Sequence, residues 1–244
     1  VISCACSSSA KVFASAARMI EVGLIDAAIV GGVDSLCLTT LYGFHALQLT
    51  AVAPCRPYDV ARAGISISEA AAFALLERPA AQPGGDAVYL LGTGESSDAY
   101  HMSSPHPEGE GARAAITAAL QAANLAPGAI DYINLHGTGT PSNDSAEAHA
   151  VHAVFGAATP CSSTKGATGH ALGAAGALEA VICALSLRHD FMPAGLASTD
   201  VDPALEVNYL RANRAGPIRH VVSNSFGFGG TNCCLVFGRA GAAT

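Results

Sequence analysis

The chain has 244 residues, of which half are hydrophobic and 13% are charged, and its formal net charge at pH 7 is -7. This hydrophobicity supports a packed core and excludes an intrinsically disordered chain. The acidic balance and the lack of a basic run exclude a protein that neutralises nucleic-acid phosphates. No apolar run reaches the roughly 18 residues that a membrane span needs, so we expect a cytoplasmic protein of one large or two medium domains.

The eight cysteines are scattered along the chain. Cys4 and Cys6 have the spacing of a metal-binding pair, but no matching pair follows at a second short spacing. Cys233 and Cys234 would point to opposite faces of a strand. We therefore expect no metal site, a reducing compartment, and cysteines that mostly serve as small core hydrophobes.

Strands and helices are predicted to alternate along the chain. The first helix is expected at residues 7–22 and ends at Gly23. Apolar runs then predict strands at residues 27–30, 88–91 and 130–135, and helices at residues 108–123, 144–155 and 171–187. The last stretch, HVVSNSFGFGGTNCCLVFG, reads as strand, glycine loop, strand. This alternation predicts α/β layers with chemistry at the carboxyl ends of strands.

Two further local signals concern a helix start and a boundary. Asp144 with Glu147 resembles a capping box at the start of the helix that ends at Phe155. The Pro- and Gly-rich stretch at residues 78–87 is the best candidate for an internal boundary. Val1-Ile2-Ser3 looks like the end of a strand without its beginning, so we expect the chain to be a fragment of a longer protein.

Cys6 lies between a short apolar run and the helix predicted at residues 7–22. At the amino end of a helix, the macrodipole and the free N–H groups favour a thiolate. We therefore expect a lowered pKa and a nucleophilic sulfur. A buried small residue without a chemical role is the alternative.

His136 follows the strand predicted at residues 130–135 and opens the sequence HGTGTPSND. A histidine at the carboxyl end of a strand can reach a cleft, and the glycines and threonines after it let backbone and hydroxyl groups approach a ligand. The alternative is a histidine without a chemical role, whose ring forms its hydrogen bonds within its own loop. His101, His106, His149 and His152 are weaker candidates, the last two on a partly solvated helix face.

Lys165 is one of only two lysines in the chain, and it precedes an apolar helix. Glu179 is the only charged residue between positions 171 and 187. An unpaired buried carboxylate is costly, so we expect Lys165 to pair with Glu179 close to His170. A buried ion pair with a purely structural role is the alternative.

Four motifs occur in one order along the chain: ACSSS, HGTGTP, STKGATGHALGAAG and NSFGFGGTN. In this order and spacing the sequence resembles the β-ketoacyl-carrier-protein synthases, the condensing enzymes of the thiolase fold. The resemblance runs through the whole chain and implies an α/β, thiolase-like layered αβαβα fold whose amino-terminal half is incomplete. Residues 1–84 would be the remainder of that half, with the nucleophile, and residues 85–244 the carboxyl-terminal half.

The resemblance also implies roles for individual residues. Cys6 would take an acyl group from a thioester. His136 and His170 would bind the malonyl thioester carbonyl, promote decarboxylation and stabilise the enolate, while Lys165 would organise the histidines and Glu179 would pair with it. The backbone N–H groups of Cys6 and Phe228 would form the oxyanion hole. Substrate-binding positions would be Thr138, Thr140, Phe226, Phe44 and Ile65.

The same resemblance implies partners and leaves the substrate open. The acyl groups would arrive on the phosphopantetheine of an acyl carrier protein, with no other cofactor, and the enzyme would be a homodimer or a heterodimer with a related subunit. Fatty-acid elongating members usually have Phe where RAGISISEAA has Ile65. Residues 11–49 look more like ketosynthases of aryl-polyene-type clusters, so the product could be a fatty acid, a polyketide or an aryl polyene.

Three other functions stay open at this point. A thiolase shares the fold but usually relies on two cysteines and one histidine. A non-catalytic partner of the chain-length-factor kind typically lacks the active-site cysteine, and Cys6 is present. A Cys/His hydrolase would not account for Lys165, Glu179 and a second histidine.

Overall fold

The structure is a computed structural model that describes residues 1–80 and 84–239. The helices are α1 (Ser8–Glu21), α2 (Leu38–Ala46), α3 (Glu110–Ala122), α4 (Pro141–Phe155), the short α5 (Lys165–Thr168) and α6 (Ala175–His189). The strands are β1 (Ala27–Asp34), β2 (Ala70–Glu77), β3 (Val88–Ser97), β4 (Tyr132–Asn134), β5 (Pro160–Ser162), β6 (Phe191–Met192), β7 (Asn208–Tyr209), β8 (Arg214–Ala215), β9 (His220–Gly227) and β10 (Thr231–Arg239).

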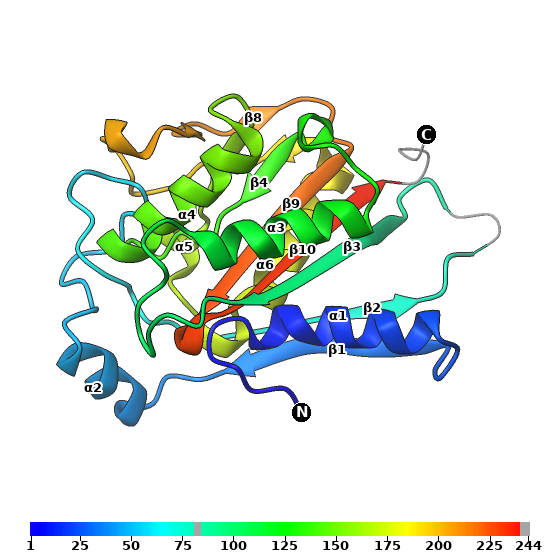
Figure 1. Ribbon diagram of the computed structural model, residues 1–244, viewed down its shortest axis with the longest axis horizontal. Helices are drawn as coiled ribbons and strands as arrows, with labels where there is room; N and C mark the ends of the chain where they lie inside the picture. Colours follow the sequence, from blue (N-terminus) through cyan, green and yellow to red (C-terminus); the bar gives the residue numbers. More distant parts are fainter. Residues whose placement is uncertain (81–83, 240–244) are drawn as a thin grey trace.

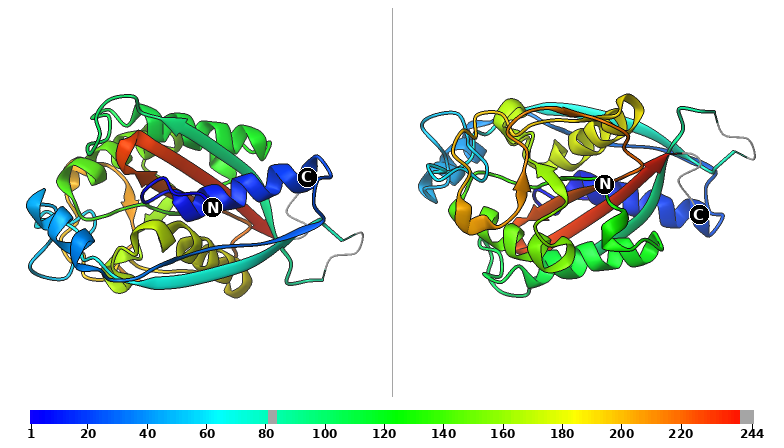
Figure 2. Two further views of the ribbon diagram at one scale, coloured as in Figure 1. Left: turned by 90° about the horizontal axis from the view of Figure 1, so that it is seen from below. Right: turned by 90° about the horizontal axis from the view of Figure 1, so that it is seen from above.

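Two sheets and two groups of helices form the layers of the molecule (Figure 1). The larger sheet has the strand order β3-β10-β9-β4-β5-β7, and the smaller sheet is the antiparallel pair β1-β2. Helices α3 and α4 lie on the outer face of the larger sheet, while α1 and α6 lie between the two sheets (Figure 2). The described residues thus form an αβαβ stack, which confirms the predicted thiolase-like layered fold as far as it is described.

The larger sheet is mixed. Strand β9 pairs parallel with β4 and antiparallel with β10, and β4 pairs parallel with β5. One hydrophobic core fills the space under α3 and α4, and a second fills the space around α1 and α6. Cys233 and Cys234 point into different cores, because successive side chains alternate across a strand. The parallel strands β4 and β5 both end at the same edge of the sheet, and this is the edge where a layered α/β fold places its ligands.

The cysteines behave as the sequence predicted. All eight are free thiols, and six of them are buried. Cys4 is half-buried and Cys37 is exposed. The fold therefore uses most of its cysteines as small core side chains.

Several predicted elements are confirmed with shifted ends. Helix α1 agrees with the prediction for residues 7–22, and Gly23 takes the positive φ of 76° that ends it. Strand β1, however, continues through Gly31 and Gly32 instead of ending there. A Cβ at Gly32 would lie 2.7 Å from the Cβ of Ser9, so the glycine lets α1 approach the strand closely.

Two local predictions are wrong. Asp144 and Glu147 do not form a capping box, because α4 begins earlier, at Pro141, and both carboxylates reach outside the helix. The helix predicted at residues 171–187 is divided into the 3-10 turn Leu172–Ala174 and α6. The break follows from Leu172, whose φ of 47° lies in the left-handed region.

The sequence did not predict α2, which is short, or β2, which lacks a clear alternation of apolar and polar residues. Residues 81–83 of the predicted boundary at residues 78–87 lie outside the described residues. The division of the chain at residues 84 and 85 stays a prediction.

Among the described residues, the stretch Leu172–His189 is long and apolar enough to cross a membrane by length and composition. This contradicts the prediction that no apolar run reaches the length of a membrane span. The stretch lies between the two sheets, and Glu179 within it pairs with Lys165. We therefore assign it as a core helix.

Candidate active site

Cys6 stands two residues before α1, in a tight turn. Ala5 before it has a φ of 52°, which is costly for a residue with a Cβ and is common at functional sites. The turn is held by hydrogen bonds: Cys4 N donates to the Ser8 hydroxyl at 2.8 Å, and the Ser7 hydroxyl donates to Cys4 O at 3.1 Å. Cys6 is only 6% exposed, and it lines a pocket that it shares with His136 and His170.

The glycine loop after β9 approaches this turn. The backbone N–H of Phe228 lies near enough to the Cys6 sulfur to lower the pKa of the thiol. A Cβ at Gly227 would lie 3.1 Å from Cys4 O and 3.2 Å from Cys6 N, so only glycine fits the contact without a shift. Gly229 and Gly230 take positive φ values of 80° and 73°, which glycine adopts readily.

The expected lowering of the Cys6 pKa is not found. Burial raises the pKa of the Cys6 thiol to about 11, and the Lys165 charge and the Phe228 N–H only partly oppose this. The desolvation of a buried thiolate thus exceeds the favourable effects of a helix start and a nearby cation. At neutral pH the sulfur is a thiol in the free protein.

His136 lies in a loop that two buried carboxylates hold in place. Glu147 accepts hydrogen bonds from the backbone N–H groups of His136 and Gly137, both at 2.7 Å. Asp144 accepts from Gly139 N at 3.2 Å and from Tyr58 N at 2.8 Å. Burial raises the pKa of Glu147 to about 7 against these hydrogen bonds. The helix α4 thus fixes the loop through two side chains on its first turns.

His170 is tied by its backbone to the segment that precedes β2. Its N–H donates to Ser66 O at 2.7 Å, and its carbonyl accepts from Ser68 N at 3.1 Å. The ring atom Nδ1 is buried and has no hydrogen-bond partner among the described residues. The rings of His136 and His170 meet edge to face with centroids 5.3 Å apart.

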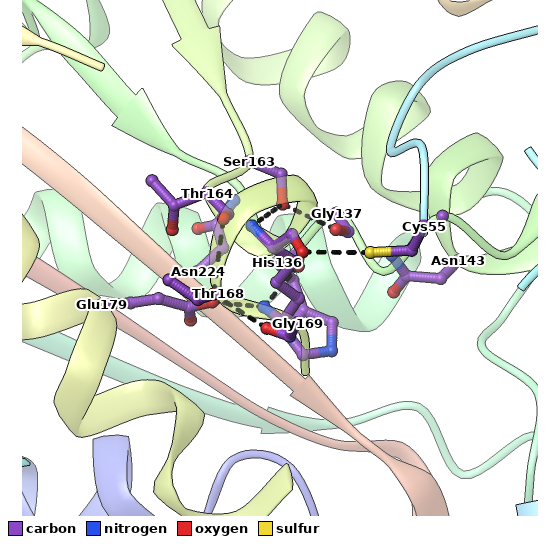
Figure 3. A network of polar contacts seen from close by, with 12 residues as sticks. Cys55, His136, Gly137, Asn143, Ser163, Thr164, Thr168, Gly169, Glu179 and Asn224 are labelled. Carbon is purple, nitrogen blue, oxygen red and sulfur yellow. Dashed lines mark hydrogen bonds and ion pairs between the residues drawn. The ribbon is translucent and has the colours of Figure 1, made fainter. Parts of the chain in front are cut away.

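Lys165 and Glu179 form a buried ion pair behind the histidines, as predicted. The Lys165 ammonium also donates to the backbone O of His136 at 2.6 Å and lies 3.4 Å from Nδ1 of the same residue. Burial raises the pKa of Glu179, while the ammonium opposes the rise. Figure 3 shows Glu179 beside His136 and the loop Ser163–Gly169 that carries the lysine.

Both histidines are neutral at pH 7. Burial is the main cause that lowers their pKa well below 6.5, and the nearby Lys165 charge lowers it further. Because an ammonium can only donate, its contact with Nδ1 of His136 places the ring proton on Nε2. Such an imidazole can donate a hydrogen bond to a carbonyl oxygen without carrying a charge.

One pocket brings the predicted residues together. It encloses about 580 Å³ of space, including its open mouth. Its lining includes Cys6, both histidines and all five predicted substrate-binding residues: Phe44, Ile65, Thr138, Thr140 and Phe226. Phe228 also lines it and stacks on Phe44 with centroids 5.4 Å apart, while Lys165 and Glu179 lie behind the wall.

Sequence reasoning missed the residues that hold this site. Glu147 and Asp144 were interpreted as a helix cap, and their hydrogen bonds to the backbone of the His136 loop were not predicted. The local sequence gave little signal, because Asp144 stands in the polar run SNDS. Only the fold places both carboxylates on a buried helix face, where they need donors. His101, His149 and His152 are exposed and lie outside the pocket. No group of three or more potential metal ligands occurs within residues 1–80 and 84–239.

Comparison with known proteins identifies the family. Residues 1–82 match the amino-terminal domain of β-ketoacyl synthases, and residues 88–199 match the carboxyl-terminal domain. The chain belongs to the β-ketoacyl synthase family. Its relative 3-oxoacyl-[acyl-carrier-protein] synthase 2 of Mycobacterium bovis is 37% identical over an alignment of 248 positions, which covers 96% of this chain and 60% of that protein. This β-ketoacyl synthase chain thus spans about 60% of the length of the relatives it matches.

Solved ketosynthase structures have the same fold. A chain of the Xenorhabdus doucetiae complex of a ketosynthase (ApeO) with its chain length factor (ApeC) superposes with a TM-score of 0.92 and 49% identity, over 98% of this chain and 59% of that chain. A chain of the AntDE:AntF complex, a type II acyl carrier protein with its ketosynthase, gives a TM-score of 0.90 at 26% identity, over 98% of this chain and 62% of that chain.

Proposed function

We propose that the chain carries the reaction centre of a β-ketoacyl-[acyl-carrier-protein] synthase. The observation that carries the proposal is the single pocket lined by a thiol and two neutral histidines, with a buried Lys–Glu pair behind them. The enzyme transfers an acyl group to Cys6 and then condenses it with a malonyl thioester, losing CO2.

In the first step the Cys6 sulfur attacks the thioester carbonyl of the incoming acyl group. The thiol proton ends on the departing carrier thiol, so an acyl-cysteine and a free carrier thiol are formed. The negative carbonyl oxygen of the intermediate is stabilised by the N–H groups of Cys6 and Phe228. A thiol whose pKa is near 11 needs this help, because its thiolate is scarce at neutral pH.

In the second step the malonyl carboxylate leaves as CO2 and its bonding electrons form an enolate. His136 and His170 donate hydrogen bonds to the thioester oxygen, where negative charge develops. Their low pKa keeps them as neutral donors, and Lys165 fixes the proton of His136 on Nε2. Preorganised donors in a buried site favour such a charge strongly.

In the third step the enolate carbon attacks the acyl-cysteine carbonyl. A carbon–carbon bond forms, the bond from carbonyl carbon to sulfur breaks, and the released thiolate takes a proton from solvent. The product is a β-ketoacyl group on the carrier. Thr138 and Thr140, whose hydroxyls lie 2.9 Å apart at the pocket wall, would contact the pantetheine arm.

The proposed partners follow from the reaction and from the neighbours. The substrates arrive on an acyl carrier protein, and the AntDE:AntF structure contains one bound to its ketosynthase. A dimer with an identical or a related subunit is supported by the complex of ketosynthase (ApeO) with its chain length factor (ApeC). No metal or further cofactor enters any step, and we place the enzyme in the cytoplasm.

Incubation with a labelled acyl-carrier and a malonyl-carrier tests the proposal. We expect a β-ketoacyl-carrier product and CO2, unchanged by a metal chelator. A free acid would indicate a hydrolase, and condensation without CO2 release from an acetyl donor would indicate a thiolase. A protein that is inactive alone but restores the condensing activity of a second subunit would indicate a chain-length-factor-like partner. The presence of Cys6 argues against this outcome.

A further inference from the structure

Asp34 is a half-buried carboxylate at the end of β1, and it reaches the turn that follows His170. Its Oδ2 accepts a hydrogen bond from Gly173 N at 2.9 Å. A Cβ at Gly173 would lie 3.1 Å from the same oxygen, so the glycine and the carboxylate are in close contact. The two residues are 139 positions apart, and the bond joins the strand of the small sheet to the start of α6.

The turn that Asp34 holds is strained. Leu172 has a φ of 47°, a left-handed conformation that is unfavourable for a residue with a Cβ. Such conformations persist only when surrounding contacts fix them. The hydrogen bond from Gly173, the next residue, is one such contact.

The position of the His170 ring depends on its backbone. Neutral histidines are commonly oriented by a hydrogen bond to the second ring nitrogen. Nδ1 of His170 has no such partner among the described residues, so no hydrogen bond to that nitrogen orients the ring there. The backbone is fixed on one side by Ser66 and Ser68, and on the other side by the turn that Asp34 holds.

We propose that Asp34 is a positioning residue for His170, acting through Gly173 and the turn Leu172–Ala174. The inference rests on the proposed function, in which His170 donates to the malonyl thioester oxygen. Because a misplacement of about 1 Å can cost roughly a hundredfold in rate, loss of the anchor slows decarboxylation while acyl transfer to Cys6 continues.

The test compares Asp34→Ala with Asp34→Asn, whose Oδ1 can still accept the Gly173 N–H. Malonyl decarboxylation should fall roughly tenfold to a hundredfold in Asp34→Ala and stay near parental in Asp34→Asn. Acyl loading and the melting temperature should change little. Asp26→Ala is the matched control, since Asp26 is fully exposed just before the same strand. If Asp34→Ala does not fold, Asp34→Leu replaces it.

An NMR measurement separates this inference from the proposed function. The imidazole nitrogen signals of His170, assigned with His170→Asn, should move in Asp34→Ala but not in Asp34→Asn or Asp26→Ala. If the parent protein decarboxylates nothing, the proposed function fails while the signals still report the anchor. Unmoved signals, parental decarboxylation, or an equal loss of both half-reactions in Asp34→Ala would each overturn the proposal.

Discussion

Two parts of the molecule repeat one arrangement. Cys6 precedes the inner helix α1, which leads into the antiparallel pair β1-β2, and His170 precedes the inner helix α6, which leads into the antiparallel pair β9-β10. The two inner helices contact each other between the sheets. Their amino ends therefore bring the thiol and the imidazole to the same pocket.

We call the part around α1, β1 and β2 the first unit, and the part that contains α3 to α6 and the larger sheet the second unit. The two units differ on their outer side. Helices α3 and α4 and the flanking strands cover β9-β10, whereas apolar side chains on the outer face of β1-β2 are exposed, with Ile29 at 79%, Leu75 at 62% and Phe73 at 58%. The buried charged residues around the histidines, Lys165, Glu179 and Glu147, all belong to the second unit. The inner helices thus bring Cys6 and His170 together, whereas the outer helix α4 fixes the loop of His136. The second unit also holds the Lys165 charge that, after burial, lowers the pKa of both histidines.

The largest effect is expected at the thiol of the first unit. Cys6→Ala should abolish the acyl adduct that intact-mass measurement detects after incubation with an acyl-carrier, because no other pocket residue is a thiol. Cys37→Ala is the control, since that thiol is exposed. An adduct that persists on another cysteine would show that the assignment is wrong.

The histidines of the second unit should affect the other half-reaction. His136→Ala or His170→Ala should slow malonyl decarboxylation by roughly a hundredfold or more, because each removes one donor to the developing charge. Acyl loading should fall much less. His149→Ala, on an exposed face of α4, should leave both rates near parental. Equal losses in the two half-reactions would contradict separate roles.

The buried ion pair tests whether charge in the second unit is structural or functional. Lys165→Met or Glu179→Leu alone should cost about 3–5 kcal/mol of unfolding free energy, since each leaves an unpaired buried charge. The double variant should recover much of this stability but not the condensation rate, because Lys165 also contacts His136. A stable double variant with near-parental activity would make the pair a scaffold only.

Acid should destabilise the second unit through its histidines. Their folded-state pKa is lowered well below the ordinary 6.5, so the unfolded chain binds more protons as the pH falls. The corresponding stability is present above pH 6.5 and is lost at lower pH. Denaturant unfolding at pH 7 and pH 5 should show a smaller loss in His170→Asn than in the parent, and an equal loss would contradict the pKa direction.

The smallest effect is expected on the outer face of the first unit. Phe73→Thr should change the unfolding free energy of the 244-residue chain by less than about 0.5 kcal/mol, because the ring is already exposed. Phe237→Ala, in the core beside α1, should cost about 3–5 kcal/mol. A cost above about 1 kcal/mol at Phe73 would show that this face is covered.

Much of the site could be predicted from the sequence because its signals are local. The four motifs place Cys6 before a helix, His136 after a strand and Lys165 before an apolar helix. The structure brings Cys6 and His136 to one pocket and places Lys165 behind its wall, in contact with His136. The Lys165–Glu179 pair also followed from composition, because a lone carboxylate in an apolar helix requires a partner.

What the sequence determined by itself is the main alternation of strands and helices and the partner of Glu179, since these depend on short-range pattern and on the general cost of buried charge. The resemblance to the family implied which residues share a site. Only the tertiary structure decided how those residues are held and charged. Asp144 and Glu147 bind the His136 loop instead of capping a helix, and Cys6 has a raised pKa instead of a lowered one. The physical reason is that desolvation and long-range hydrogen bonds depend on how the layers stack, which no local pattern records.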